Sequence, residues 1–246
     1  MVKKAVIMAA GLGMRLNGHF DLKPKGFIVV GSYPIIERSI KILLRNGIEK
    51  IVIGTGYMSE HYENLAKEYP QIECVKSADY QTTGNVYTLY NMRRYINEDF
   101  ILLESDLIYE ERAIELLQND DNTDIVLASG WTNSGDEFYI EVNENKNLVK
   151  MSKNKDELKN LYGELVGISK LSLATFKELC AWAKMYFKEN IRVDYEFALS
   201  SISKKIPIAI KKIEDLIWTE IDNEEHLRSA LKLIYPRIHE KEYEEV

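Results

Sequence analysis

Residues 9–25 bring together the residue types that bind a triphosphate, in the sequence AAGLGMRLNGHFDLKPK. Gly11 and Gly13 carry no side chain, so backbone N–H groups at these positions can approach phosphate oxygens. Arg15 adds a planar set of hydrogen-bond donors, and Lys25 and a second lysine two residues before it add point charges. The types and spacing of these residues predict a phosphate-binding loop.

Two other phosphate-binding loops do not fit this segment. The dinucleotide fingerprint requires a third glycine where the chain has Leu16, and an acidic residue after the second strand, where residues 54–56 read Gly-Thr-Gly. A P-loop requires Gly-Lys-Ser or Gly-Lys-Thr, which the chain lacks. These mismatches disfavour an NAD-linked oxidoreductase and a P-loop enzyme. The alternative is a surface turn that connects two elements and binds no ligand.

The loop follows an apolar run at residues 4–9, which is typical of a strand buried on both faces of a sheet. Similar runs predict strands at residues 50–54, 72–75, 100–104 and 124–129, with helices at residues 34–46, 58–68, 84–95 and 110–118. This alternation predicts an α/β fold with a largely parallel sheet. Ligands bind such sheets at the carboxyl ends of the strands, so the loop lies where a ligand is expected.

After residue 129 the pattern changes to smaller elements. They are antiparallel strands at residues 137–142 and 148–152, an apolar run at 165–168, helices at 173–188, 194–203 and 224–234, a strand at 206–212 and an extended segment at 218–222. No low-complexity linker interrupts the chain, which predicts one domain over residues 1–236. Residues 237–246 are expected to form a charged tail that is frayed from His239 onward.

Composition limits the partners of this chain. Its 246 residues carry a formal net charge of −7, and its basic pairs are dispersed among acids, which argues against nucleic acid. The chain has no signal-peptide pattern and no apolar run long enough to span a bilayer, so we expect no membrane partner and a cytoplasmic location. Cys74 and Cys180 have no CxxC partner and are interpreted as reduced core residues.

Two aspartates stand at strand ends where a metal ion could bind. Asp106 follows the run at residues 100–104, and Asp222 stands between an extended segment and the last predicted helix. Each has a structural alternative, since Asp106 could cap a following helix and Asp222 could form a capping box with Glu225. The four histidines are not spaced as zinc ligands, whereas a few carboxylates together with phosphate oxygens suit Mg²⁺.

If the compound that reacts with the triphosphate is a phosphate or a phosphonate, the reaction needs no catalytic base. The attacking oxygen of such a compound is already ionised near neutral pH, whereas a hydroxyl group must first lose a proton. The difficulty is then the repulsion between two anions, roughly 4 kcal/mol for each pair of unit charges at 4 Å and an effective dielectric constant of 20. We therefore expect cations and positioning to supply catalysis.

The first strand, the pattern A-A-G-x-G-x-R-L and a Pro-Lys pair before a further apolar run together resemble the nucleotidyltransferases, which join a nucleoside triphosphate to a phosphorylated small molecule and release pyrophosphate. The resemblance covers residues 2–236. It implies a Rossmann-like, three-layer α/β fold whose mostly parallel mixed sheet carries a small antiparallel acceptor-binding portion. It also implies that Arg15 and Lys25 are catalytic and that Asp106 and Asp222 hold Mg²⁺.

In this family the region around residues 79–85 contacts the nucleobase. The implied nucleotide-binding residues are Ala9, Ala10, Gly11, Leu12, Gly13, Arg15, Lys25, Thr83, Gly84, Asn85 and Ser105. The segment that begins at Asn85 resembles cytidylyltransferases acting on small zwitterionic compounds such as phosphocholine or 2-aminoethylphosphonate, which favours CTP over UTP, dTTP and ATP. An ordinary loop with Asn85 as a helix cap is the structural alternative.

The implied acceptor site lies in later segments. Its candidate residues are Asp136, Glu137, Tyr139, Lys153, Glu164, Asp194, Trp218 and Glu220. Carboxylates and aromatic rings suit the cationic end of such an acceptor, and acids outnumber aromatics in residues 134–141, which favours a primary amine over a quaternary one. Several segments resemble the 2-aminoethylphosphonate cytidylyltransferases most. Some of these are fused to an aminotransferase, which makes an aminotransferase a candidate partner or fusion domain.

Three functions are compatible with these sequence features. The first is a Mg²⁺-dependent cytidylyltransferase that joins CTP and 2-aminoethylphosphonate. The second is the same chemistry on phosphocholine, or on a sugar or polyol phosphate. The third is a non-catalytic nucleotide sensor, which would keep the glycine loop but could dispense with Lys25, Asp106 and Asp222.

Overall fold

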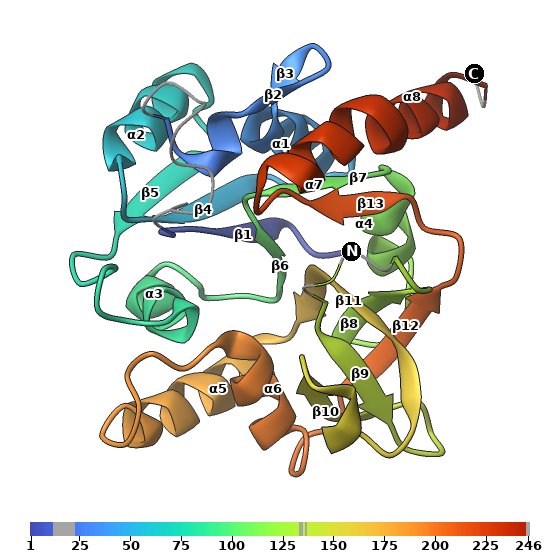
Figure 1. The fold of residues 1–246 in the computed structure, drawn as a ribbon. Helices are drawn as coiled ribbons and strands as arrows, with labels where there is room; N and C mark the ends of the chain where they lie inside the picture. The colour runs from blue at the N-terminus through green and yellow to red at the C-terminus, as the bar shows by residue number, and fades with distance from the viewer. Residues whose placement is uncertain (12–22, 133–134, 136, 245–246) are drawn as a thin grey trace.

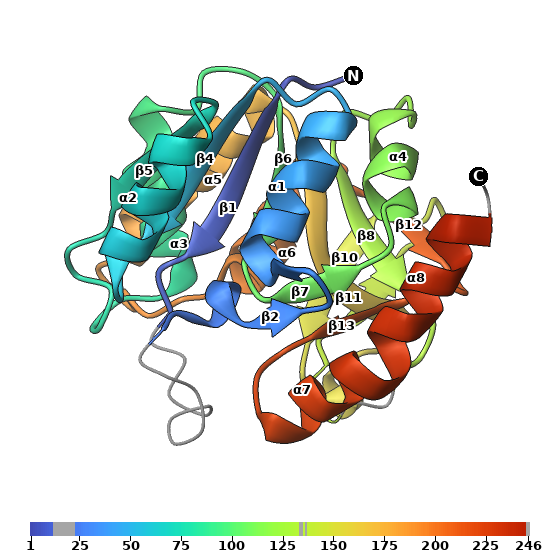
Figure 2. The same cartoon turned by 90° about the horizontal axis from the view of Figure 1, so that it is seen from above.

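A mixed β-sheet between two layers of helices forms the body of the protein (Figure 1). The computed structural model describes residues 1–11, 23–132, 135 and 137–244. One face carries α1 (Ile35–Arg45), α2 (Ser59–Glu68) and α4 (Arg112–Gln118), and the other carries α3 (Asn85–Asn91), α5 (Leu173–Tyr186) and α6 (Tyr195–Ile202). Seen from above, α1 and α2 lie in front of the strands and α5 and α6 behind them (Figure 2). These layers confirm the fold class expected from the sequence.

The described residues contribute nine strands to the main sheet. Its path is β10-β9-β11-β6-β1-β4-β5, and β8 joins β11 to β12. The strands are β1 (Lys4–Ala9), β4 (Lys50–Thr55), β5 (Ile72–Lys76), β6 (Phe100–Glu104), β8 (Ile125–Ser129), β9 (Tyr139–Val142), β10 (Leu148–Ser152), β11 (Leu161–Leu171) and β12 (Ala209–Ile213). β5, β4, β1 and β6 run parallel, whereas β11 runs antiparallel to β6, β8 and β9. The antiparallel portion expected after residue 129 is therefore present.

Strand β1 divides the apolar core into two clusters. Ala5 and Ile7 belong to a cluster with α1 and α2, while Val6 and Met8 belong to a cluster with α3 and α5. Alternate residues of a strand face opposite sides, so an uninterrupted apolar run is the pattern of a strand covered on both faces. Because both faces of β1 are packed, the carboxyl end of this strand has a fixed position. The residues that follow the strand begin there.

Two short strands outside the main sheet join distant parts of the chain. β7 (Leu107–Tyr109) pairs antiparallel with β13 (Trp218–Glu220), and the Ile221 N–H donates to the Asp106 carbonyl at 3.0 Å. This ladder removes the alternative that Asp106 caps a following helix, because the three buried apolar residues after it form a strand and the N-cap of α4 is Glu111. Asp106 therefore caps no helix and lies beside the segment that carries Asp222.

The charged end of the chain is helical, which corrects the expectation of a frayed tail. The last elements are α7 (Glu224–Ser229), the π-helical η5 (Ala230–Ile234) and α8 (Tyr235–Glu244); the remaining short elements are η2 (Lys25–Phe27), β2 (Val29–Val30), β3 (Tyr33–Pro34), η3 (Met92–Arg94) and η4 (Lys155–Glu157). The Arg38 Nη2 lies 2.9 Å from Glu242 Oε1, which also accepts the Glu111 N–H at 2.9 Å. These ionic contacts attach α8 to the body of the protein.

Ile238 anchors α8 on its apolar side. Its side chain is fully buried in a cluster with Ile28, Ile108 and Ile221. Ile238→Ala is expected to lower the free energy of unfolding by about 2–5 kcal/mol, because burial is lost and a cavity remains. Urea unfolding followed by circular dichroism measures this change. Leu233→Ala is the control, since that side chain is 61% exposed, and equal losses in the two variants would contradict this packing.

Two further expectations concern the cysteines and the membrane. Cys74 and Cys180 are free and partly buried, and burial raises the pKa of their thiols, to about 11 and about 12. Such protonated thiols are weak nucleophiles and weak metal ligands. None of the helices in the described ranges combines the length and the apolar character needed to cross a bilayer.

Candidate active site

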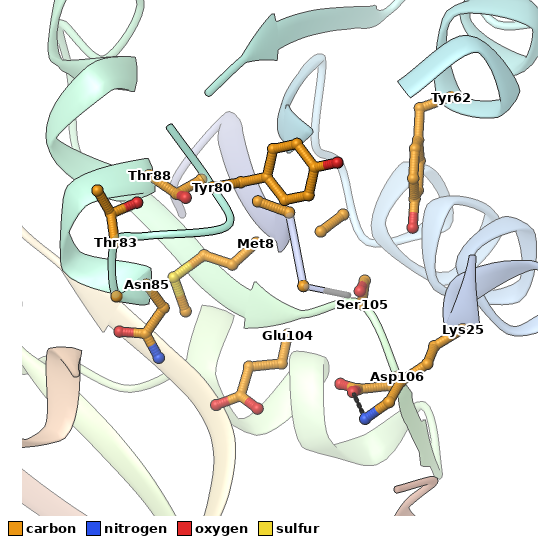
Figure 3. Close-up of a pocket in the computed structure, with 14 residues that line it drawn as sticks. Met8, Lys25, Tyr62, Tyr80, Thr83, Asn85, Thr88, Glu104, Ser105 and Asp106 are labelled. Atoms are coloured by element: carbon orange, nitrogen blue, oxygen red, sulfur yellow. Dashed lines mark hydrogen bonds and ion pairs between the residues drawn. The ribbon is translucent and has the colours of Figure 1, made fainter. Parts of the chain in front are cut away.

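A cavity of about 220 Å³ lies at the carboxyl ends of β1 and β6 (Figure 3). Residues 9–11 line it from the end of β1, and residues 104–106 line it from the end of β6. The two strands are neighbours in the sheet, with Met8 opposite Glu104. This first cavity therefore lies where the ligands of open α/β sheets bind.

The structure brings most of the predicted nucleotide-binding residues to the first cavity. Those that line it are Ala9, Ala10, Gly11, Lys25, Thr83, Gly84, Asn85 and Ser105. Leu12, Gly13 and Arg15 lie outside the described residues. Gly11 before that segment and Lys25 after it line the cavity, so both described ends of the predicted phosphate loop lie at it.

Gly84 and Asn85 join the first cavity to the loop before α6. A Cβ atom at Gly84 would lie 2.3 Å from the Val193 carbonyl oxygen, so the close approach of the two segments requires glycine. The Asn85 Oδ1 accepts the Tyr195 N–H at 2.7 Å. Asn85 is not the helix cap that its sequence allows, because Gly84 occupies that position. The Nδ2 hydrogens of Asn85 are thus the donors that it can offer a nucleobase.

Lys25 bridges the two aspartates that were predicted to hold a metal ion. Its Nζ lies 3.1 Å from Asp106 Oδ2 and also bonds to Asp222 Oδ1. Burial alone would lower the pKa of Lys25, but the two carboxylates outweigh burial and raise it above its usual value. Asp222 does not cap α7, since the cap is Asn223, whose Oδ1 accepts the His226 N–H at 2.9 Å. Lys25 is therefore the cation held between the two aspartates.

Glu104 and Glu220 enlarge the acidic group around Asp106. One carboxylate oxygen from each of these three side chains lies within 4.8 Å of the others. Burial, and then repulsion from neighbouring carboxylates, raises the pKa of Glu104 well above its usual value and that of Glu220 to about 10. A divalent cation would relieve this repulsion. The all-oxygen donor set fits Mg²⁺, which takes few protein ligands beside phosphate and water.

A second cavity of about 210 Å³ adjoins the first and shares Asn85 and Glu104 with it. The predicted acceptor residues that line it are Glu137, Lys153, Asp194, Trp218 and Glu220. Asp106 lines the first cavity and Asp222 lines the second, so the bridge through Lys25 lies between them. The arrangement can hold two small ligands on either side of one group of charges.

Two predicted acceptor residues lie behind the wall of the second cavity and do not line it. The Tyr139 hydroxyl donates to Glu137 Oε2 at 3.0 Å, and Glu164 Oε2 accepts the N–H and the hydroxyl of Thr132, both at 2.7 Å. Glu164 is 1% exposed. Both side chains thus bond to residues that line the second cavity, Glu137 and Thr132, and are not among its lining residues themselves. Asp136 lies outside the described residues.

Glu104 and Glu196 line the cavities although neither was among the predicted site residues. Glu104 ends a buried strand two residues before Asp106, a spacing that places two extended side chains on one face. Glu196 follows Asp194 by two residues and lies in a helix that is otherwise apolar at its start. In both cases an acidic residue within an apolar run of the sequence was the feature that could have indicated a site residue. Tyr80, which also lines the first cavity, was not named as a site residue, although it lies in the region of residues 79–85 where the resemblance implied nucleobase contacts.

The fold and its first cavity define a Rossmann-like α/β protein with a cavity beyond the carboxyl ends of β1 and β6. A family model named nucleotidyl transferase matches residues 4–179. The chain therefore belongs to the nucleotidyl transferase family, as its sequence motifs indicated.

Curated relatives of this chain include cytidylyltransferases. It is 23% identical over 222 residues to the 2-aminoethylphosphonate cytidylyltransferase of Lancefieldella rimae, covering 89% of this chain and 88% of that protein. It is 31% identical over 107 residues to the choline-phosphate cytidylyltransferase of Streptococcus pneumoniae, covering 44% and 46%. The chain spans half or less of the length of several other curated relatives that it matches.

Among solved structures, the inositol-1-phosphate CTP transferase from T. maritima superimposes with a TM-score of 0.82. The alignment covers 97% of this chain and 96% of that chain at 19% sequence identity. At this identity the likeness concerns the fold, and it confirms the Rossmann-like nucleotidyltransferase architecture.

Proposed function

We propose that the protein is a Mg²⁺-dependent cytidylyltransferase that joins CTP and 2-aminoethylphosphonate to give CMP-2-aminoethylphosphonate and pyrophosphate. The observation that carries the proposal is the pair of adjoining cavities with Lys25, Asp106 and Asp222 between them. With CTP in the first cavity and the acceptor in the second, the reacting groups would meet where these charges gather. A nucleotide sensor would have no use for the second cavity.

In the proposed reaction a phosphonate oxygen attacks the α-phosphorus of CTP. A new oxygen–phosphorus bond forms, the bond from the α-phosphorus to the bridging oxygen of the β-phosphate breaks, and pyrophosphate leaves. Mg²⁺ held by Asp106 and Asp222, with the neighbouring glutamates, would supply positive charge to the phosphates. Lys25 would leave the aspartates for the triphosphate, and Arg15 would add a second cation. No general base is needed, because the attacking oxygen is already ionised.

The second cavity suits a small acceptor with a cationic end. Its volume of about 210 Å³ is below the roughly 300 Å³ at which pockets for drug-sized ligands begin. Carboxylates from Glu137, Asp194 and Glu220 line it, so an ammonium group would find opposite charge there. The named acceptor of the Lancefieldella rimae relative has such an ammonium group. We expect this activity in the cytoplasm, with an aminotransferase acting on the same phosphonate as partner or fusion domain.

Phosphocholine is the alternative acceptor, and a sugar or polyol phosphate follows it. The choline-phosphate cytidylyltransferase among the relatives supports the first, and the inositol-1-phosphate CTP transferase supports a polyol phosphate. These acceptors share the anionic end that would meet the α-phosphate of CTP. They differ at the other end, so the second cavity decides between them.

A matrix of substrates tests donor and acceptor together. CTP, UTP, ATP and dTTP are each combined with 2-aminoethylphosphonate, phosphocholine, inositol 1-phosphate and glucose 1-phosphate in the presence of Mg²⁺, and pyrophosphate release is measured. We expect kcat/KM for CTP with 2-aminoethylphosphonate to exceed that of every other pair by about tenfold or more. Highest activity with phosphocholine would shift the function to the alternative. Absence of release from every pair would contradict a transferase.

A further inference from the structure

Glu196 is a buried carboxylate among the residues that line the second cavity, and one of its oxygens has no hydrogen-bond partner among the described residues. It lies in the first turn of α6, is 5% exposed and lines the cavity. Its Oε2 has no hydrogen-bond partner among the described residues. Buried polar atoms are nearly always paired, because an unpaired carboxylate oxygen away from water loses its hydration without replacement. The unpaired oxygen of Glu196 therefore lacks a hydrogen-bond donor, and a bound ligand could supply one.

The surroundings of Glu196 favour a cation as that ligand group. Burial, and then the carboxylates of Asp194 and Glu220, raises the pKa of Glu196 to about 8. Lys153 offsets part of this effect by its charge, yet it makes no bond to Oε2. A positively charged donor at Oε2 would at once pair the oxygen and offset the repulsion between these acids.

The aromatic side chains of the second cavity are poorly arranged for a quaternary ammonium group. Such a group has no N–H to donate and is held by several ring faces. Phe138 and Trp218 are the aromatic residues among those that line this cavity in the described part of the chain. The Phe138 ring already has the Lys153 Nζ at 5.1 Å from its centre. A nitrogen that carries hydrogens is thus the better match for Glu196 than a methylated one.

We infer that Glu196 is a specificity-determining residue, whose carboxylate accepts an N–H from the ammonium group of the acceptor and so selects primary amines over quaternary ones. The inference deepens the proposed function and rests on it, since it assigns the second cavity to the acceptor. Residues 194–196 suited the cationic end of an acceptor by their composition, but Asp194 and not Glu196 was named as the site residue of that segment. Its role follows from burial, an unpaired oxygen and its place in the cavity wall.

Three matched acceptors test this role in the wild type and in Glu196→Gln. They are 2-aminoethylphosphonate, its N,N,N-trimethyl derivative and ethylphosphonate, which has no nitrogen, each assayed with CTP and Mg²⁺ by pyrophosphate release. We expect the wild type to favour 2-aminoethylphosphonate over the trimethyl derivative by about 100-fold or more in kcat/KM. Glu196→Gln should lower kcat/KM for 2-aminoethylphosphonate by about 10- to 100-fold, as for a lost charge-assisted hydrogen bond, and leave ethylphosphonate nearly unchanged.

Glu189→Gln is the matched control, because it makes the same substitution at an exposed carboxylate that lines neither cavity. It should leave kcat/KM for 2-aminoethylphosphonate nearly unchanged. Equal use of the two amines by the wild type would overturn the inference without any variant. So would an equal loss for all three acceptors in Glu196→Gln, or a selective loss as large in Glu189→Gln.

Calorimetric titration separates this inference from the proposed reaction. Wild type and Glu196→Gln are titrated with 2-aminoethylphosphonate and with ethylphosphonate, and a CTP titration shows that the variant is folded. The role of Glu196 is supported if the wild type binds 2-aminoethylphosphonate about tenfold or more tightly than ethylphosphonate and the variant loses this difference. This holds even if no pyrophosphate is released. Equal binding of the two phosphonates by the wild type contradicts it, even if the transferase reaction occurs.

Discussion

Asp106→Asn is expected to lower kcat with CTP and 2-aminoethylphosphonate about a hundred- to a thousandfold. Asparagine has no negative charge and a single side-chain oxygen, so it would hold a divalent cation poorly at the point where the two cavities meet. Loss of one preorganised electrostatic contact in an active site has an effect of this size. Pyrophosphate release at saturating substrates, over a range of Mg²⁺ concentrations, measures it.

Asp215→Asn is the matched control for this variant. The Asp215 side chain is 70% exposed and pairs with Arg112 at 3.0 Å (Nη2 to Oδ1), so its loss should leave turnover unchanged. Near-normal turnover of Asp106→Asn at every Mg²⁺ concentration would contradict a metal ion at Asp106.

Lys25→Met is expected to change metal binding and turnover in opposite directions. Without nucleotide, the Lys25 ammonium holds Asp106 and Asp222 together, so its removal makes both carboxylates available to a divalent cation. Mn²⁺ affinity, measured by electron paramagnetic resonance, should rise about tenfold, equivalent to about 1.4 kcal/mol. This is less than the roughly 4 kcal/mol for two unit charges at 4 Å in an effective dielectric of 20. Turnover should fall about a hundred- to a thousandfold, because the triphosphate loses its cation.

Lys150→Met serves as the control for Lys25→Met. Lys150 pairs with Glu157 at the surface, with 2.6 Å between Nζ and Oε2, and its replacement should alter neither Mn²⁺ affinity nor turnover. If Lys25→Met bound Mn²⁺ no more tightly than the wild type, Lys25 would not occupy the place of the metal. Lys25 would then be a structural cation, and the exchange proposed between aspartates and triphosphate would be wrong.

The parts of the fold that could be predicted depend on short-range patterns. The apolar run of β1 requires burial on both faces, and the glycines after it require a loop, so both can be recognised from a few neighbouring residues. Asp106 was recognisable for the same reason, since it follows directly on a buried strand. The region around Gly84 was found through the family resemblance. Its glycine now has a physical reason in the contact with the Val193 carbonyl.

The parts that could not be predicted depend on contacts between distant residues. The ladder of β7 with β13, which places Asp222 beside Asp106, joins three-residue strands that carry too little pattern to be recognised. The C-terminal segment was expected to fray because it is rich in charge. In the structure Ile238 is buried and Glu242 pairs with Arg38, which is 204 residues away in the sequence. Local composition does not encode either contact.

The acceptor side of the site was harder to predict than the nucleotide side. Glu137 precedes β9 and Glu164 lies in the neighbouring β11, yet only the three-dimensional arrangement separates the residue that lines the cavity from the one that bonds to Thr132. Residues 194–196 suited a cationic group by their composition, but the sequence does not show that Glu196, in the first turn of α6, is buried whereas Asp194 is exposed. Acceptor residues come from many elements, whereas the phosphate loop is one continuous segment.

Phosphorus NMR of CTP and 2-aminoethylphosphonate with the protein and Mg²⁺ tests most directly whether two ligands react across the adjoining cavities. We expect the phosphonate and CTP signals to decline together, while a coupled pair of signals from a phosphonate–phosphate linkage and an equimolar pyrophosphate signal grow. Removal of Mg²⁺ with a chelator should stop this change. Conversion of CTP to CDP and phosphate, or unchanged spectra with every acceptor of the substrate matrix, would contradict nucleotidyl transfer.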